Sequence, residues 1–134
     1  MAIADRNGLP VAARIASASP HEVTLVKDTL KSRFTRKKPK RLVGDLAYDS
    51  DPLDQQLKSE EGVEFIAPHK KNRVKPKTQD GRVLRRFRRR WQVERLFSWL
   101  QNYRRIVTRW EYKAENFQGM VQLACLMILF RIFD

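Results

Sequence analysis

The chain has 134 residues, enough for one domain with a modest core. Its 28 Lys and Arg residues outnumber its 15 Asp and Glu residues and give a formal net charge of +13 at pH 7. Such an excess points to a polyanionic partner, most often nucleic acid, with a merely solvated basic surface as the alternative. Because the charges are spread along the chain and the apolar run 120–130 is too short to cross a bilayer, no membrane partner is expected.

Two short apolar runs open the chain and flank an Asn-Gly pair. The runs cover residues 1–5 and 9–16, and Asn7 and Gly8 lie between them. Asn-Gly favours a type I′ turn, in which both central residues take positive φ. This pattern predicts a β-hairpin, with Pro10 tolerated near the start of its second strand.

A helix is predicted next, from Ser19 to about Arg33. Ser19 is a good N-cap, Pro20 suits the first helical position and Glu22 completes a capping box. The following apolar residues recur at helical spacing: Val23, Val26 and Leu30.

The middle of the chain is predicted to hold two short strands around a second helix. The strands cover residues 41–44 and 63–66. Asp51 and Pro52 have the chemistry of a helix start, as cap and first-turn residue, and Gly62 is placed to end that helix.

The last part of the chain is predicted to be mainly helical. A basic loop over 68–77 leads into a long helix over 80–103, and a loop at 110–113 precedes a final apolar helix over 115–133. The element order is then ββ-α-β-α-β-α-α, which is an α/β pattern. One domain covering 1–134 is expected.

Glu94 is the first candidate for chemistry. Positions 87, 90, 94 and 101 fall on one stripe of the predicted long helix, at 100° per residue. Apolar side chains flank Glu94, so we expect a carboxylate on the inward-facing arc, where it needs a partner. That partner is either Arg90, one turn earlier, or a metal ion, with Arg90 steadying the carboxylate or contacting a phosphate.

Asp45 is the second candidate. It closes a predicted strand, and α/β folds place ligands and catalytic groups at the carboxyl ends of strands. A strand-end Asp also forms turns or caps helices, but Asp49 and Asp51 are better placed for those tasks. His69 has no metal-ligand spacing to another His or Cys and is expected to be part of the basic loop.

These residues carry a resemblance to a known family. Gly44–Asp51, with sequence G-D-L-A-Y-D-S-D, resembles the D-x-x-Y-D-S-D element of DDE-type transposases from bacterial insertion sequences. The V-E-R-L-F run at 93–97, with Y-R-R-I and T-R-W behind it, resembles their V-E-R-x-F … F-R-R-I-x-T-R-Y element. Asn116 and Phe117 resemble the R-N-F that opens the family's last helix. The match covers nearly the whole chain, and its motifs are specific in combination.

The resemblance implies a ribonuclease-H-like fold in which Asp45 is the second catalytic Asp and Glu94 the catalytic Glu, both of them ligands of Mg²⁺. In the family's Y-R-E-K signature, Phe87 stands here for the Tyr and Gln101 for the Lys, so a cation near the DNA is lost. The family's first catalytic Asp lies on the central strand, before the segment that residues 1–16 resemble. We therefore expect this chain to lack that strand and that Asp.

The function implied is Mg²⁺-dependent DNA cleavage and strand transfer at insertion-sequence ends during transposition, incomplete without the first Asp. The alternative is a non-catalytic, basic DNA-binding remnant of a transposase. Cys125 is the only cysteine and no secretory signal is visible, which together with the bacterial family predicts a cytoplasmic, nucleoid-associated protein.

The expected partner is DNA, both insertion-sequence ends and target. Unpaired strand edges also predict pairing with an upstream transposase segment or a second copy of the chain. Basic side chains in the loop and the long helix would contact phosphates, which gives affinity but little sequence recognition. The candidate DNA-binding residues are Lys70, Lys71, Arg73, Arg88, Arg89, Arg90 and Arg95.

Overall fold

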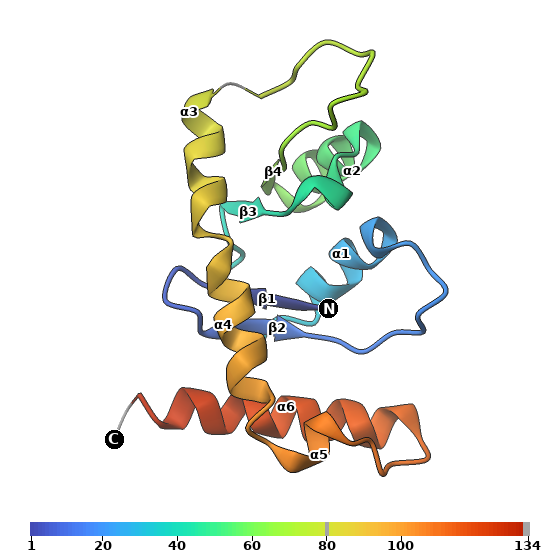
Figure 1. The fold of residues 1–134 in the computed structure, drawn as a ribbon, viewed down its shortest axis with the longest axis vertical. Helices are drawn as coiled ribbons and strands as arrows, with labels where there is room; N and C mark the ends of the chain where they lie inside the picture. Colours follow the sequence, from blue (N-terminus) through green and yellow to red (C-terminus); the bar gives the residue numbers. More distant parts are fainter. Residues whose placement is uncertain (80, 133–134) are drawn as a thin grey trace.

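The computed structural model describes residues 1–79 and 81–132 and shows a mixed α/β architecture (Figure 1). It contains two two-stranded sheets. One is an antiparallel hairpin of β1 (Ala2–Ala4) and β2 (Pro10–Ala13). The other is a parallel pair of β3 (Arg41–Val43) and β4 (Glu64–Ile66). All four strands lie where the sequence predicted them.

The hairpin forms through a different turn from the one predicted. The Asp5 carboxylate Oδ1 accepts hydrogen bonds from the N–H groups of Asn7 at 2.8 Å and Leu9 at 2.9 Å. Among the described residues, positive φ occurs only at glycines, and in this turn only at Gly8, at 82°. A type I′ turn also requires positive φ at Asn7, so that prediction was wrong: the Asp5 side chain organises a longer loop.

The first helix, α1 (Glu22–Lys31), begins later and ends earlier than predicted. Its N-cap is His21, whose Nδ1 accepts a hydrogen bond from the Val23 N–H at 3.4 Å. Ser19 therefore does not cap it. Leu30, near the end of α1, is fully buried, as its helical spacing indicated.

The second helix, α2 (Asp51–Gln56), has Ser50 as its N-cap instead of Asp51. The Ser50 hydroxyl accepts a hydrogen bond from the backbone N–H three residues later, at 3.4 Å. A π-helical turn, η2 (Leu57–Glu61), continues α2. Gly62 then ends the helix in the left-handed conformation, with φ 67°, as predicted.

The single helix predicted over 80–103 is divided into three segments in the described chain. They are α3 (Gly81–Leu84), the 3-10 segment η3 (Arg85–Arg89) and α4 (Trp91–Leu100), which follow one another along the left side of Figure 1. The 3-10 segment coincides with the densest run of arginines, and like charges one turn apart destabilise an α-helix.

The C-terminal part contains one helix more than predicted. A short helix, α5 (Arg104–Val107), precedes the expected loop, and α6 (Ala114–Phe130) follows it. The predicted end of this last helix, at residue 133, lies outside the described residues. Within the described chain, no helix combines the length and hydrophobicity needed to span a membrane.

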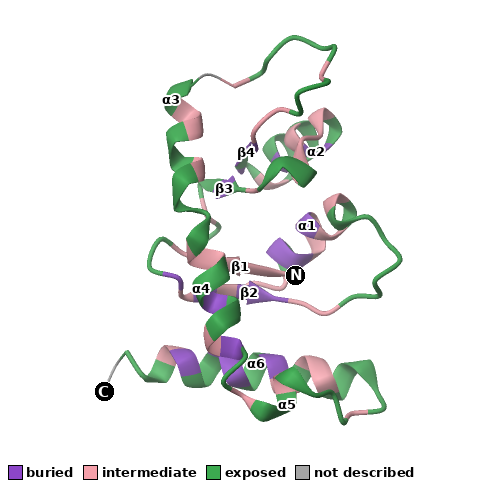
Figure 2. Cartoon of the chain, viewed as in Figure 1, coloured by how far each residue is buried: buried purple, intermediate pink, exposed green. Residues whose placement is uncertain are grey.

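Two apolar clusters hold the elements together. One joins α1, α2 and the parallel strands through Val26, Leu30, Leu42, Leu53, Leu57, Val63, Phe65 and Ala67. The other joins the hairpin, α4 and α6 through Ala13, Leu96, Leu100, Val121, Ala124, Cys125 and Ile128. Figure 2 shows buried positions gathered where α4 crosses α6.

Candidate functional site

The helix that carries Glu94 turns a different face to the core from the one predicted. On α4, Leu96 and Leu100 are buried, whereas Glu94 is exposed. Its carboxylate forms no hydrogen bond or ion pair with any residue that the structure describes. The guanidinium of Arg90 lies over the ring of Phe87, 5.0 Å from its centroid, instead of pairing with Glu94. The expectation of an inward-facing carboxylate was therefore wrong, and of the two partners considered for it, the Arg90 ion pair does not form.

Asp45 lies just after β3 and caps a short 3-10 turn, η1 (Leu46–Tyr48). Its Oδ1 accepts a hydrogen bond from the Ala47 N–H at 2.9 Å. The side chain is exposed and forms no ion pair within the described part of the chain. The capping task therefore falls to Asp45, not to the later aspartates as expected, and one carboxylate oxygen stays available to solvent.

Packing around Asp45 fixes the position of its turn. A Cβ atom at Gly44 would lie 2.6 Å from Cζ of Phe65, so only glycine lets the backbone approach this ring. The Tyr48 ring meets Phe65 edge-on, with centroids 6.2 Å apart, and its hydroxyl donates to Glu22 Oε2 at 2.9 Å. Burial and the Glu22 carboxylate raise the pKa of Tyr48, which keeps its hydroxyl protonated as the donor.

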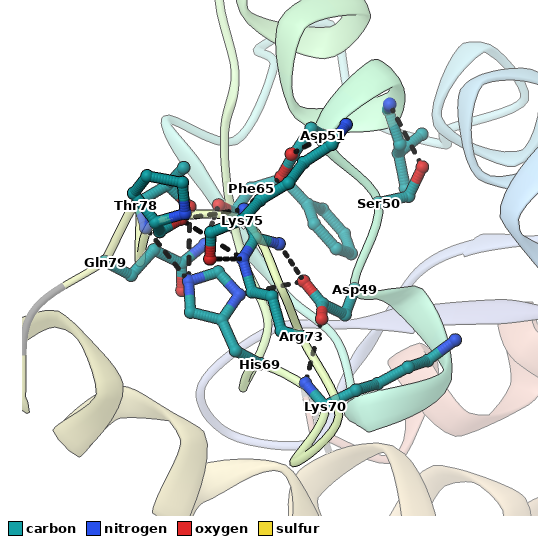
Figure 3. A network of polar contacts seen from close by, with 12 residues as sticks. Asp49, Ser50, Asp51, Phe65, His69, Lys70, Arg73, Lys75, Thr78 and Gln79 are labelled. Carbon is teal, nitrogen blue, oxygen red and sulfur yellow. Dashed lines mark hydrogen bonds and ion pairs between the residues drawn. The ribbon is translucent and has the colours of Figure 1, made fainter.

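The next two aspartates of the motif bind an arginine of the basic loop (Figure 3). Arg73 Nη1 lies 3.0 Å from Asp49 Oδ1, and Arg73 Nη2 lies 2.7 Å from Asp51 Oδ1. The Arg73 side chain is only 11% exposed. Burial alone would raise the pKa of Asp49, but hydrogen bonds from the Lys70 N–H and His69, with the charge of Arg73, lower it. The hydrogen bond from Arg73 lowers the pKa of Asp51.

His69 completes this arrangement, which we call the Asp49 network: Asp49, Asp51, His69 and Arg73. His69 Nδ1 lies 2.8 Å from Asp49 Oδ1, and its Nε2 accepts a hydrogen bond from the Thr78 N–H at 3.1 Å. The neutral tautomer with its proton on Nδ1 satisfies both contacts. His69 thus ties the two ends of the basic loop together, a role that no spacing in the sequence indicated.

The remaining predicted DNA-binding residues are exposed and differ in what holds them. Lys70 and Lys71 project from the loop, and Arg88 and Arg89 project from η3. The guanidinium of Arg95, in contrast, stacks over two indole rings, with centroids 4.4 and 5.7 Å away, and its Nη1 donates weakly to a hairpin-turn carbonyl at 3.5 Å. This side chain fastens α4 to the hairpin.

Two exposed arginines were missed as candidates. Arg85 and Arg86 line a hollow of about 420 Å³ together with Arg82, Val83 and Arg89. The four arginines that line the hollow are three or four residues apart (82 to 85 and 86, and 85 and 86 to 89), which places them on one side of a helical segment. That signal was present in the sequence. A hollow lined by several arginines suits phosphate oxygens.

The two candidate carboxylates supply part of a metal site. Carboxylate oxygens are the hard donors that Mg²⁺ prefers, and neither Asp45 nor Glu94 is neutralised by a cation of the described chain. No hydrogen bond or ion pair joins these two residues to each other. Within residues 1–79 and 81–132, no group of three or more His, Cys, Asp or Glu side chains is placed to hold a metal ion.

Comparisons with known proteins agree on one family. The model of the transposase DDE domain matches residues 1–129. A transposase named for insertion sequence element IS402 of Burkholderia cepacia is 28% identical over 134 residues, covering 94% of this chain and 59% of the relative. A transposase named for IS6501 of Brucella ovis is 37% identical over 92 residues, covering 67% of each. The chain thus spans 59% of the length of the first relative. No solved structure matches it.

Proposed function

The chain belongs to the family of transposase DDE domains, and on that basis we propose that it carries two of the acidic residues that an insertion-sequence transposase uses to cleave and join DNA. These residues are Asp45 and Glu94. One observation carries the proposal: Asp45 and Glu94 stand at the acidic positions of the two motifs that resemble the family's, and both carboxylates are exposed without a cationic partner among the described residues. Seven other acids form salt bridges: Asp28, Asp49, Asp51, Glu60, Glu61, Glu64 and Glu111.

The proposed fold is ribonuclease-H-like, with residues 1–134 as one domain. In the described chain, β1 pairs only with β2 and β3 pairs only with β4, which supports a further strand between the two sheets. Such a strand would come from an upstream transposase segment or a second copy. It would also bring the third carboxylate that two-metal phosphodiester chemistry calls for.

Each residue has a proposed task. Mg²⁺, when bound, polarises the phosphodiester that is attacked. Asp45 and Glu94 would hold it, and the Ala47 N–H keeps Asp45 in one orientation. Exposed arginines of η3 would contact backbone phosphates at insertion-sequence ends and target, which fixes the position of the DNA without selecting its sequence. A bacterial, nucleoid-associated location follows from this proposal.

A strand-transfer assay tests the proposal directly. The protein is this chain joined to the upstream part of a full-length relative, and the variants are Asp45→Asn and Glu94→Gln. We expect both to lose Mg²⁺-dependent strand transfer while keeping their affinity for DNA. Glu115→Gln is the matched control, because Glu115 is another exposed acid without a salt bridge in the described chain.

Unchanged strand transfer in Glu94→Gln would remove Glu94 from the site. Salt-sensitive DNA binding that needs no metal, with no strand transfer in any variant, would favour a non-catalytic DNA-binding protein.

A further inference from the structure

The loop between α5 and α6 presents two aromatic side chains to solvent. Trp110 is 68% exposed and Tyr112 is 98% exposed. Exposed aromatic side chains of this size are uncommon on a protein surface that binds nothing, because their apolar area stays in water. The loop therefore has the composition of a contact surface.

The same loop is held in shape by its own hydrogen bonds. The guanidinium of Arg109 donates to the carbonyl oxygens of Glu111 at 2.9 Å and Tyr112 at 3.1 Å. Arg105 Nη1 lies 2.8 Å from Glu111 Oε1, and Glu111 Oε2 accepts from the Trp110 N–H at 3.3 Å. The aromatic side chains thus extend from a braced backbone, which lowers the entropy lost when they bind.

Exposed cations lie on both sides of the two aromatic residues in the sequence. Arg104 opens α5, one turn before the loop, and Lys113 is the last residue of the loop. Neither forms an ion pair with any residue in the described part of the chain. Glu111 is the one acid between them, and Arg105 neutralises it. The surface that carries the aromatics is therefore positively charged.

We propose that the loop 108–113 binds single-stranded nucleic acid. Trp110 and Tyr112 stack on unpaired bases, and Arg104 and Lys113 contact the flanking phosphates. Every base has a π-face, so this recognition tolerates sequence, and a positive groove with aromatic platforms is how proteins hold unpaired strands. The unpaired positive charge favours this ligand over a protein partner.

This site involves neither Asp45 nor Glu94, so it goes beyond the proposed function and is tested separately. Unchanged strand transfer in Glu94→Gln, with unpaired strands still bound through their bases, would overturn the proposed function and leave the present proposal standing. Loss of strand transfer in Glu94→Gln, without any preference for strands that carry bases, would do the opposite.

The experiment measures fluorescence anisotropy of the 134-residue chain with three labelled probes. They are a short oligothymidylate, an abasic strand with the same number of phosphates, and a duplex of the same length. We expect the chain to bind oligothymidylate more tightly than the abasic strand. Trp110→Ala should weaken oligothymidylate binding about ten-fold and leave the abasic and duplex affinities within about two-fold.

Further variants separate stacking from a merely apolar contact. Trp110→Phe should keep most of the affinity, whereas Trp110→Leu should lose as much as Trp110→Ala. Tyr112→Ala gives a second reading at a side chain too exposed to affect folding. Val74→Ala, at an apolar side chain that is 99% exposed in another loop, is the matched control and should change nothing.

Equal affinity of the unmodified chain for oligothymidylate and the abasic strand would overturn the proposal, as would an equal loss on all three probes. An affinity for oligothymidylate that is as high in Trp110→Leu as in Trp110→Phe would also overturn it, and would assign the loop to an apolar contact with a protein.

Discussion

The basic loop at 68–79 and the helical segment at 81–90 are both rich in cations, but they use that charge differently. In the loop, Arg73 is 11% exposed and neutralises two aspartates, with His69 beside it. In the helical segment, several arginines are exposed and form no ion pair with a described residue: Arg85, Arg86, Arg88 and Arg89. The number of cations in a segment therefore does not locate a phosphate-binding surface, because carboxylates distant in the sequence decide which cations are available.

The largest effect on stability is expected from breaking the Asp49 network of the basic loop. Asp49→Ala removes the acceptor shared by His69, Arg73 and the Lys70 N–H, and leaves the largely buried Arg73 guanidinium paired with Asp51 and no longer with Asp49. We expect the free energy of unfolding to fall by about 2–4 kcal/mol in urea titrations. Arg88→Gln, in the unpaired region, should change it by less than about 0.5 kcal/mol. Equal effects of the two variants would contradict the contrast between the regions.

DNA binding should show the opposite pattern. Replacing Arg85, Arg86 and Arg89 together by glutamine should lower duplex affinity and reduce the slope of log K against log salt by about 2–3, because each lost phosphate contact removes roughly 0.9. Arg73→Gln should leave that slope unchanged when measured on folded protein. A shallower salt dependence for Arg73→Gln would show that, in the unmodified chain, the Arg73 guanidinium leaves Asp49 and Asp51 to contact DNA.

A smaller, pH-dependent effect is expected at Asp54, beside the Asp49 network. Burial, with the charges of Asp51 and Asp49, raises the pKa of Asp54 from 3.8 to about 6. Its contribution to stability is therefore complete below pH 3.8 and is lost as the pH rises through 6. Asp54→Asn should remove this dependence and stabilise the fold by about 1 kcal/mol above pH 7, allowing for solvent screening of a half-buried group.

Urea midpoints across the pH range check this prediction. The pKa values of Asp49 and Asp51 are lowered, so their contributions are present above the ordinary pKa and are lost only at more acidic pH. They cancel when the Asp54→Asn variant is compared with the unmodified chain. Parallel stability curves for the two proteins between pH 4 and pH 7 would be the contrary result.

The smallest expected difference in stability concerns the packing of Arg95, a cation of α4, against the hairpin turn. A Cβ atom at Gly8 would lie 3.0 Å from Arg95 Cδ, whereas one at Gly62 would meet nothing within 4 Å. Both glycines have positive φ, so Gly8→Ala and Gly62→Ala share a backbone penalty of about 1–2 kcal/mol. Gly8→Ala should lose up to about 1 kcal/mol more, from the disturbed contact with α4. Equal losses in urea would show that the hairpin turn does not depend on this contact.

Features determined by neighbouring residues could be predicted from the sequence. The four short strands and the stop at Gly62 follow from apolar runs and one glycine. Helix starts were less predictable, because His21 and Ser50 act as caps although Ser19 and Asp51, close by in the sequence, also have good capping chemistry. The Asp49 network could not be predicted, since its partners lie about twenty residues further along the chain.

The side of the helix on which Glu94 lies was predicted wrongly for a geometric reason. The predicted stripe assumed one regular helix from residue 80 onward, but η3 has a 3-10 conformation. A 3-10 helix advances 120° per residue instead of 100°, so five residues shift the phase by roughly 100°. Within α4 itself, the apolar spacing of Val93, Leu96 and Leu100 indicated the buried side. Glu94 lies roughly 130° around the helix from the centre of that side, at 100° per residue, and therefore in solvent.

The central claim is that Asp45 and Glu94 hold one cation between them. Paramagnetic broadening of amide NMR signals by Mn²⁺, a hard cation that replaces Mg²⁺ at oxygen ligands, tests it without an activity assay. The account predicts that amides beside both residues broaden together, that Asp45→Asn abolishes the broadening beside Glu94, and that Glu115→Gln changes nothing. Broadening beside Glu94 that persists in Asp45→Asn would contradict a shared site.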